Sequence, residues 1–293
     1  MTKAVLGIIG GSGVYDLPGL EGVREERIAS PWGEPSDAVR IGRIGNTAIA
    51  FLPRHGRGHR LSPSDINYRA NIDVLKRAGV TDLVSVSACG SFRPELHPGL
   101  FVLVDQFVDR TYKRESSFFG AGCVAHVSMA QPVGPRLQKR LAAAAKAEGI
   151  EAKTGGTYVC MEGPQFSSLA ESLTYKSLGY DVIGMTNMPE AKLAREAEIT
   201  YASVAMVTDY DCWHPEHAAV EVADIIKVVV ANAEKAARLV ARLARDFPAE
   251  HEPCPAKSDR ALDTAIITAP AFRDPALLRK LDYVAGRVLR AGT

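Results

Sequence analysis

Residues 199–214 read ITYASVAMVTDYDCWH, and this stretch sets the expected fold. Its first part, up to Val207, is mostly apolar and has the length of a buried strand. It ends at two carboxylates, Asp209 and Asp211, and a long helical pattern follows over 218–246. The pattern predicts an α/β fold, in which ligands bind outside the carboxyl ends of the strands. We therefore expect both carboxylates at a ligand site.

The surroundings of Asp209 and Asp211 suit acid catalysis. Met206, Tyr210 and Trp213 are apolar or aromatic neighbours, beside which the pKa of a carboxyl rises. A carboxylic acid that stays partly protonated near neutral pH can donate a proton to a leaving group. The alternative is that the two aspartates are only turn residues or the cap of the next helix. The remaining strand ends bear on this choice.

The composition limits the function classes. The chain has 293 residues, enough for one large α/β domain or two small ones, and 46% of them are hydrophobic. The formal net charge of +1 offers no basic field for nucleic acid and no polybasic membrane anchor. The sequence has no signal pattern at its N-terminus and no apolar run long enough to span a bilayer. We expect a cytoplasmic protein that binds neither nucleic acid nor membranes.

The cysteine and histidine spacings do not favour a metal centre. The five cysteines are scattered without a CxxC pair, which is typical of reduced thiols. His55 and His59 are a candidate ligand pair, but Gly56 and Gly58 argue against the helix that would align them. We expect no metal and no cofactor.

Several strand ends carry groups that bind anions. The first predicted strand runs into residues 10–13, GGSG, where backbone N–H groups can approach an anion and Ser12 adds a hydroxyl. Another strand ends in the loop 53–60, PRHGRGHR, where Arg54 and His55 offer N–H donors. A plain tight turn and a solvated basic loop are the respective alternatives. We favour a phosphate-type anion over both.

Two further segments point to the same anion. A predicted strand over 82–87 ends at Ser87, within the small-residue run SACGS. The segment 185–190, MTNMPE, reads as a helix start, so Thr186 lies near a helix N-terminus, where anions are favoured. The other expected elements are strands at 37–43, 47–53, 100–104, 154–161 and 181–184, helices at 62–78, 134–148 and 168–178, and an irregular segment at 105–126.

The remaining site candidates suit a flat base. Phe166 and Ser167 follow the strand at 154–161, and an aromatic ring there could stack on a base while the hydroxyl binds its edge. Core packing of Phe166 is the alternative. An anion site, a flat apolar pocket with Met185, and paired carboxylates together suit attack by phosphate on a nucleoside. Such a reaction needs phosphate in line with C1′ and charge drawn from the departing base.

The chain resembles the trimeric purine nucleoside phosphorylase family over residues 4–247, most closely its branch that acts on 5′-methylthioadenosine. The motifs that carry the resemblance are GGSG (10–13), RHG (54–56), SACGS (87–91), EGPQFS (162–167), MTNMPE (185–190) and TDYDCW (208–213). The resemblance implies a single-domain α/β fold with a mixed, barrel-like central sheet surrounded by helices. It also implies homotrimers, or a dimer of trimers, with sites near subunit interfaces.

The resemblance assigns roles residue by residue. Asp209 would be the general acid at purine N7, with Asp211 beside the 6-amino group, and inorganic phosphate would be the co-substrate. His126 would reach across the subunit interface toward the 5′-substituent, and Val222 and Ile225 would face the methylthio group. The phosphate positions would be Gly11, Ser12, Arg54, His55, Ser87, Ala88 and Thr186, and the substrate positions Phe166, Ser167, Met185, Thr208, Asp209, Asp211, His126, Val222 and Ile225.

Hydrogen bonding favours a 6-aminopurine substrate. A carboxylate accepts from the 6-NH₂ of adenine, and a protonated carboxyl donates to N7. We therefore expect phosphorolysis of S-methyl-5′-thioadenosine by residues 1–247, with 248–293 as a helical extension on the same domain or on a neighbouring subunit. The alternatives are a phosphorylase for 5′-methylthioinosine or for purine nucleosides in general, a hydrolytic nucleosidase, and a non-catalytic purine-binding protein.

Overall fold

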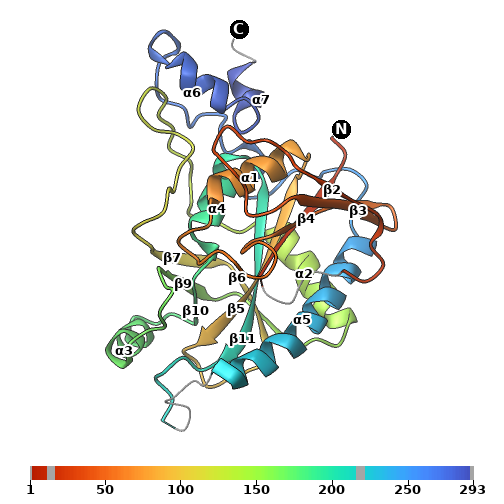
Figure 1. Ribbon diagram of the computed structural model, residues 1–293, viewed down its shortest axis with the longest axis vertical. Coiled ribbons are helices and arrows are strands. Elements are labelled where there is room, and N and C mark those ends of the chain that lie inside the picture. The colour runs from red at the N-terminus through yellow and green to blue at the C-terminus, as the bar shows by residue number, and fades with distance from the viewer. Residues whose placement is uncertain (1, 12–16, 216–221, 291–293) are drawn as a thin grey trace.

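The computed structural model describes residues 2–11, 17–215 and 222–290. The elements follow one another as strands and helices mixed along the chain (Figure 1). In order they are β1 (Val5–Gly10), β2 (Glu21–Glu26), β3 (Val39–Ile44), β4 (Thr47–Pro53), α1 (Tyr68–Arg77), β5 (Asp82–Ser91), β6 (Phe101–Val104), β7 (Gln106–Arg110), α2 (Pro135–Ala147), β8 (Ala152–Thr154), β9 (Thr157–Met161), α3 (Leu169–Ser177), β10 (Val182–Gly184), α4 (Asn187–Glu196), β11 (Thr200–Asp209), α5 (Val222–Arg245), η1 (Ser258–Arg260), η2 (Pro270–Phe272), α6 (Pro275–Lys280) and α7 (Gly286–Leu289).

The central sheet branches at β5. This strand pairs in parallel with β1 on one side and with β11 on the other, and its last residues pair antiparallel with β10. One branch continues from β10 to β9 and β7, and the other continues from β11 to β6 and β8. Asp105 joins β6 directly to β7, so the two branches meet again and enclose a barrel-like space. The mixed sheet predicted from the sequence is confirmed.

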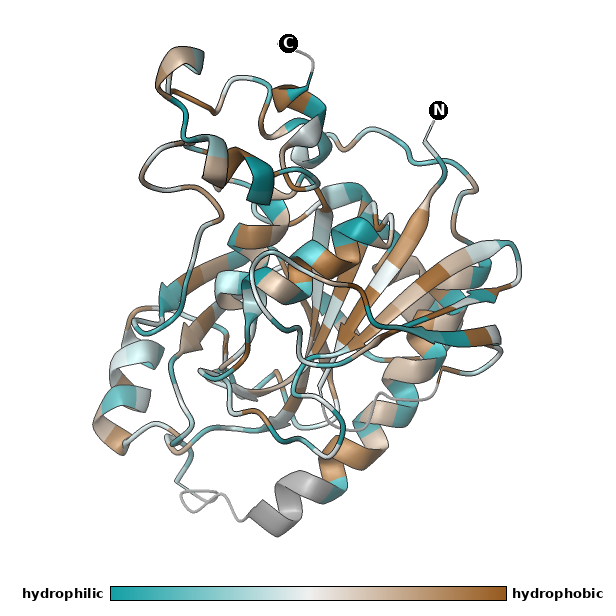
Figure 2. Ribbon diagram, turned by 45° about the horizontal axis from the view of Figure 1, so that its top comes forward, coloured by the Kyte–Doolittle hydropathy of each residue, from teal (hydrophilic) through white to brown (hydrophobic). Residues whose placement is uncertain are grey.

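Helices cover the sheet on opposite sides (Figure 1). Helices α2 and α5 pack together on one side, and α1 and α4 pack together on the other. Helix α5 buries Ala233, Ala236, Leu239, Val240 and Leu243, at the spacing that places side chains on one helix face. Figure 2 shows the apolar residues concentrated in the central strands, which are covered on both faces.

Three expected element boundaries were wrong. Helix α1 begins at Tyr68 instead of Ser62, because Asn67 is its N-cap and accepts a hydrogen bond from the backbone N–H of Ala70. The expected irregular segment contains β7, a strand that pairs only with β9 and has a polar sequence, QFVDR. The expected strand 154–161 is two strands, interrupted at Gly155 and Gly156, which both have positive φ.

Residues 248–290 wrap around the domain as short helical turns and loops (Figure 1). They begin beside β1, where the N–H of Ala4 donates to Ala249 O, and they reach the loop that precedes α2. There the N–H of His126 donates to Ala265 O (2.9 Å), and Ile266 forms a β-bridge with Ala125. Across the described ranges, the search for a helix long and apolar enough to cross a membrane found none.

Candidate active site

A cavity of about 500 Å³ opens where β1, β4, β5, β10 and β11 end. This is the edge of the sheet at which the sequence predicts a ligand site. The cavity is lined by many of the predicted residues, namely Gly11, Arg54, His55, Ser87, Ala88, Phe166, Met185, Thr186, Thr208, Asp209 and Asp211. All of the predicted anion groups that the structure describes line this one cavity, so their geometry is compatible with a single anion site.

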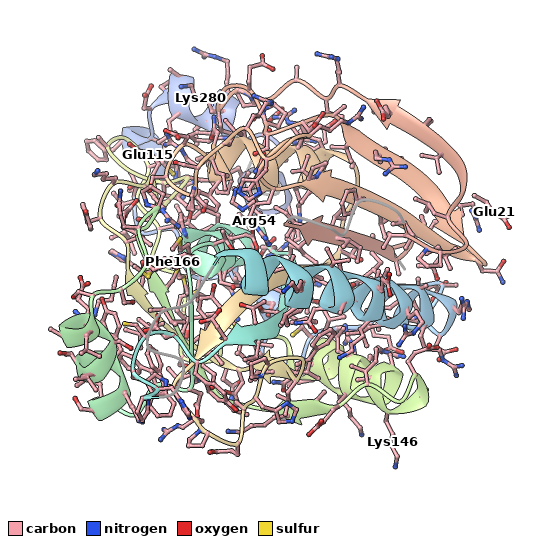
Figure 3. All side chains as sticks on the ribbon, turned by 60° about the horizontal axis from the view of Figure 1, so that its bottom comes forward. Glu21, Arg54, Glu115, Lys146, Phe166 and Lys280 are labelled. Carbon is pink, nitrogen blue, oxygen red and sulfur yellow. The ribbon has the colours of Figure 1, made fainter. Side chains whose placement is uncertain are left out.

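Arg54 lies in the interior and not on a solvated loop (Figure 3). Its side chain is 0% exposed and forms a two-point ion pair with the equally buried Glu190, at 2.8 Å from Nε and 3.2 Å from Nη2. Nη1 donates to Val86 O (3.1 Å), and a Cβ added to Gly11 would lie 3.8 Å from this nitrogen. The second N–H of Nη1 can therefore serve an anion beside the glycine turn.

His55 lines the same cavity as Arg54, and we call the part formed by Arg54, His55 and Thr186 its anion end. Its ring stacks on His59 at 4.2 Å between centroids, and both rings line the cavity. Burial lowers the pKa of His55 to about 4, and the nearby charge of Arg54 acts in the same direction. The ring is therefore neutral at physiological pH. Because a carbonyl oxygen can only accept, Nδ1 carries the ring proton and donates to Leu61 O (2.9 Å).

Thr186 offers a hydroxyl that is not yet used. Met188, near the start of α4, has non-helical backbone angles, and Thr186, directly before the helix, makes no side-chain capping hydrogen bond to it. Its Oγ1 is buried and has no hydrogen-bond partner among the described residues. Buried hydroxyls are normally hydrogen-bonded, so this atom is placed to bind a ligand.

The two carboxylates lie at the other end of the cavity. Burial raises the pKa of both Asp209 and Asp211 above the usual range for aspartate. Asp209 accepts hydrogen bonds from Thr208 Oγ1 (2.6 Å) and from the backbone N–H of Asp211 (2.8 Å). Asp211 Oδ2 is buried and has no hydrogen-bond partner within the described ranges, although the nearby hydroxyls of Ser172 and Ser167 act on this carboxyl and partly offset the rise in its pKa. One carboxyl is thus held in place, while an oxygen of the other is available to a ligand.

The comparisons with known proteins agree with this geometry. A sequence model described as "Phosphorylase superfamily" matches residues 5–245. The S-methyl-5′-thioadenosine phosphorylase of Bradyrhizobium diazoefficiens is 77% identical over 99% of this chain and 100% of its own length. The chain belongs to this phosphorylase family. The corresponding protein of Cereibacter sphaeroides is 62% identical over 98% of this chain and 99% of its own length.

Solved structures of family members have the same fold. A methylthioadenosine phosphorylase from an Antarctic soil metagenomic library superposes with a TM-score of 0.90 at 44% identity, covering 97% of this chain and 99% of its own. The methylthioadenosine phosphorylase of Schistosoma mansoni, solved in complex with adenine, superposes with a TM-score of 0.79 at 36% identity, covering 83% and 91%.

The residues expected from the family resemblance differ in whether they line the cavity. Phe166 does line it and is 62% exposed, so it is not a core residue. Ser167 lies beside the cavity: its carbonyl accepts from Cys212 Sγ (3.4 Å) and its hydroxyl contacts Met161 Sδ (3.7 Å). His126 is exposed on the loop before α2 and is not among the lining residues. Ser12 lies outside the described residues, as do the side chains of Val222 and Ile225 at the start of α5.

Two charged residues that position the anion end, Glu190 and Arg114, were not predicted from the sequence. Glu190 is the ion-pair partner of Arg54, whereas the sequence pattern predicts only that it belongs to the start of a helix. Arg114 lies in the segment expected to be irregular, and it donates to Met185 O (2.6 Å) and Met188 O (2.7 Å). It also pairs with Glu162 at 3.2 Å, with both side chains buried. Arg114 thereby fixes the backbone on both sides of Thr186, and no local sequence pattern signals this role.

Neither a metal centre nor a disulfide is found among the described residues. In this part of the chain, no three or more His, Cys, Asp or Glu side chains lie close enough together to hold a metal ion. All five cysteines are free thiols, as expected. Burial raises the pKa of Cys89, which lines the cavity next to Asp209, so this thiol stays protonated.

Proposed function

We propose that this protein catalyses phosphorolysis of S-methyl-5′-thioadenosine to adenine and 5-methylthioribose 1-phosphate. The observation that carries the proposal is a single cavity with an anion end, formed by Arg54, His55 and Thr186, and a carboxyl end, formed by Asp209 and Asp211. The names of the relatives support the same reaction. The enzyme would be a pentosyltransferase of purine and methionine salvage.

The reaction follows from the two ends of the cavity. Phosphate at the anion end lies in line with C1′, and its oxygen forms the C1′–O bond as the C1′–N9 bond breaks with its electron pair leaving on the purine. The Asp209 carboxyl gives its proton to N7, so adenine departs as a neutral molecule and Asp209 is left as a carboxylate that solvent reprotonates. Its raised pKa keeps this acid protonated to a higher pH than an ordinary aspartate.

The base preference rests on Asp211. Its buried, unpartnered Oδ2 can accept from the 6-NH₂ of adenine, while a 6-oxopurine would place an oxygen against it. This disfavours the alternative substrates, 5′-methylthioinosine and 6-oxopurine nucleosides in general. The neutral His55 and the paired Arg54 form an anion site that a hydrolytic nucleosidase would not need.

The finer site assignments form part of the proposal. Gly11, Ser12, Ser87 and Ala88 would complete the phosphate site, with Met185 against the ribose and Phe166, Ser167 and Thr208 near the base. In a homotrimer, the exposed His126 of one subunit would reach the 5′-end of the neighbouring site, and Val222 and Ile225 would face the methylthio group. Residues 1–247 would form the catalytic domain and 248–293 its extension. We propose a cytoplasmic enzyme with phosphate as co-substrate and no cofactor.

The proposal is tested by base release from S-methyl-5′-thioadenosine with and without phosphate, with 5′-methylthioinosine measured in parallel. We expect adenine release that requires phosphate, and slower release from the inosine analogue. Release without phosphate would identify a hydrolase, and turnover of the inosine analogue alone would contradict the role of Asp211.

A second prediction concerns Gly90, which lies behind the catalytic carboxyl. A Cβ at this position would lie 2.9 Å from Asp209 Oδ1 and 3.1 Å from Ile183 Cγ2. Gly90→Ala should therefore displace the Asp209 carboxyl and lower kcat by on the order of a hundredfold, since small misplacements of a catalytic group have effects of that size. Gly120→Ala, at an exposed glycine without a positive φ and with open space around it, is the control and should retain normal turnover. Full activity of Gly90→Ala would show that Asp209 tolerates the shift.

A further inference from the structure

A chain of buried polar side chains runs beneath the anion end of the cavity. It begins at Arg54 and passes through Glu190, Tyr201 and Asn187 to Ser87. These residues are at most 4% exposed, and they come from β5, α4, β11 and the loop that directly follows β4. The two residues at the ends of the chain, Arg54 and Ser87, both line the cavity.

The chemistry of Glu190 fixes the direction of the first hydrogen bonds. The permanently charged guanidinium of Arg54 donates to both of its oxygens, so the carboxylate acts as an acceptor. Tyr201 OH lies 2.9 Å from Glu190 Oε1 and must donate its proton there. Burial raises the pKa of Tyr201, which keeps that proton on the hydroxyl.

The same logic orients the amide of Asn187. Since the proton of Tyr201 is given to Glu190, its oxygen can only accept, and the amide atom at 2.7 Å from it must be the NH₂ group. The NH₂ group also donates to Ser203 Oγ at 2.8 Å. The amide carbonyl therefore faces Ser87 Oγ at 3.1 Å and accepts the proton of that hydroxyl.

Ser87 consequently presents only lone pairs to the cavity. Its single proton is directed to Asn187, so Oγ can act only as an acceptor toward its other neighbours, which are the buried hydroxyl of Tyr158 and whatever lies at the anion end. His55 likewise has only a lone pair left to offer. Its Nδ1 proton is donated to Leu61 O, and Nε2 of the neutral ring carries no proton. The anion end thus combines donors, at Arg54 and Thr186, with acceptors that a fully deprotonated anion cannot satisfy.

We propose that the cavity selects a tetrahedral oxyanion that still carries a proton, and that Asn187 sets this selectivity by committing the proton of Ser87. The P–O–H group of hydrogen phosphate donates to Ser87 Oγ, whereas sulfate, a dianion of the same shape without a proton, leaves that oxygen unpaired. A site that is built to hydrogen-bond a ligand O–H discriminates strongly against the analogue that lacks it. This inference rests on the proposed function, because it assigns phosphate to the anion end.

The test measures the dissociation constants of inorganic phosphate and sulfate for the full chain at neutral pH by isothermal titration calorimetry, together with phosphate-dependent adenine release. We expect phosphate to bind at least about tenfold more tightly than sulfate. If phosphate and sulfate bind equally tightly and turnover requires phosphate, this inference is overturned and the proposed function stands. Turnover without phosphate would overturn both.

Variants separate the proton preference from a general loss of binding. Ser87→Ala removes the acceptor and should weaken phosphate binding about tenfold while leaving sulfate binding nearly unchanged, and Ser87→Thr should restore the preference. Asn187→Leu frees the Ser87 proton and should tighten sulfate binding relative to phosphate. Ser203→Ala alters the network away from the cavity and should keep the wild-type ratio. Equal weakening of both anions in Ser87→Ala would contradict the proposal.

Discussion

Replacing Asp209 by asparagine should lower kcat for the 6-aminopurine nucleoside by about 10²- to 10⁴-fold, the range that general acid catalysis contributes. The amide keeps the size of the side chain, and its oxygen can accept from the backbone N–H of Asp211. Its NH₂ group replaces the second carboxylate oxygen and can donate to Thr208 Oγ1, whose own proton can go to Cys89 O, but it has no acidic proton to give to N7. The amide NH₂ can instead donate toward a purine O6, so the ratio of activity on 5′-methylthioinosine to activity on S-methyl-5′-thioadenosine should rise.

The pH profile separates acid catalysis from a positional role of Asp209. Burial raises its pKa, so the wild-type enzyme keeps the protonated acid at low pH and loses it as pH rises through that value. The alkaline decline in kcat that belongs to Asp209 should therefore be absent from Asp209→Asn. Asp246→Asn changes an exposed carboxylate that pairs with Arg242, and should leave the profile unchanged. Unaltered turnover by Asp209→Asn would remove this residue from the acid role.

Glu190→Gln is the substitution with the largest expected effect on stability. Both members of the Arg54–Glu190 pair are 0% exposed, and the change leaves a buried guanidinium without a counter-charge. We expect the free energy of unfolding to fall by about 3–5 kcal/mol, the usual consequence of removing one partner of a buried pair. Urea denaturation monitored by circular dichroism measures this change.

The pair formed by Arg57 and Glu25 is a matched control on the surface. Its side chains are 55% and 47% exposed, so solvent screens the charges. Glu25→Gln should therefore change the free energy of unfolding by about 1 kcal/mol or less. If Glu190→Gln costs no more than this control, the guanidinium of Arg54 does not depend on Glu190 for its charge balance.

The sequence was most informative where chemistry and secondary structure coincide. The run before Asp209 is apolar because β11 is buried on both faces, and the predicted strand ends do form one cavity. The polar strand β7 gave no such signal, because a short strand with half-exposed residues lacks a continuous apolar run. Helix α1 was placed too early because Ser62 and Asp65 have good capping chemistry, whereas the actual cap is Asn67.

The proton arrangement of the site could not be predicted from the sequence. Arg54 and Glu190 are separated by 136 positions, and Ser87 and Asn187 by 100. No local pattern links residues this far apart. Whether a hydroxyl donates or accepts is decided by the partner that folding brings to it, so Ser87 was expected to supply a hydroxyl to the anion without any indication that its proton is already committed.

The branch point at β5 has a consequence for synthesis on the ribosome. β5 needs β11 along one whole edge, yet about a hundred residues separate the two strands in the chain. At typical translation speeds this edge of β5, with its unpaired backbone N–H and C=O groups, stays without its partner for roughly 5 to 20 seconds after it is made. The nascent chain must be guarded against aggregation during this interval, and the carboxyl end of the cavity, which β11 delivers, is completed last.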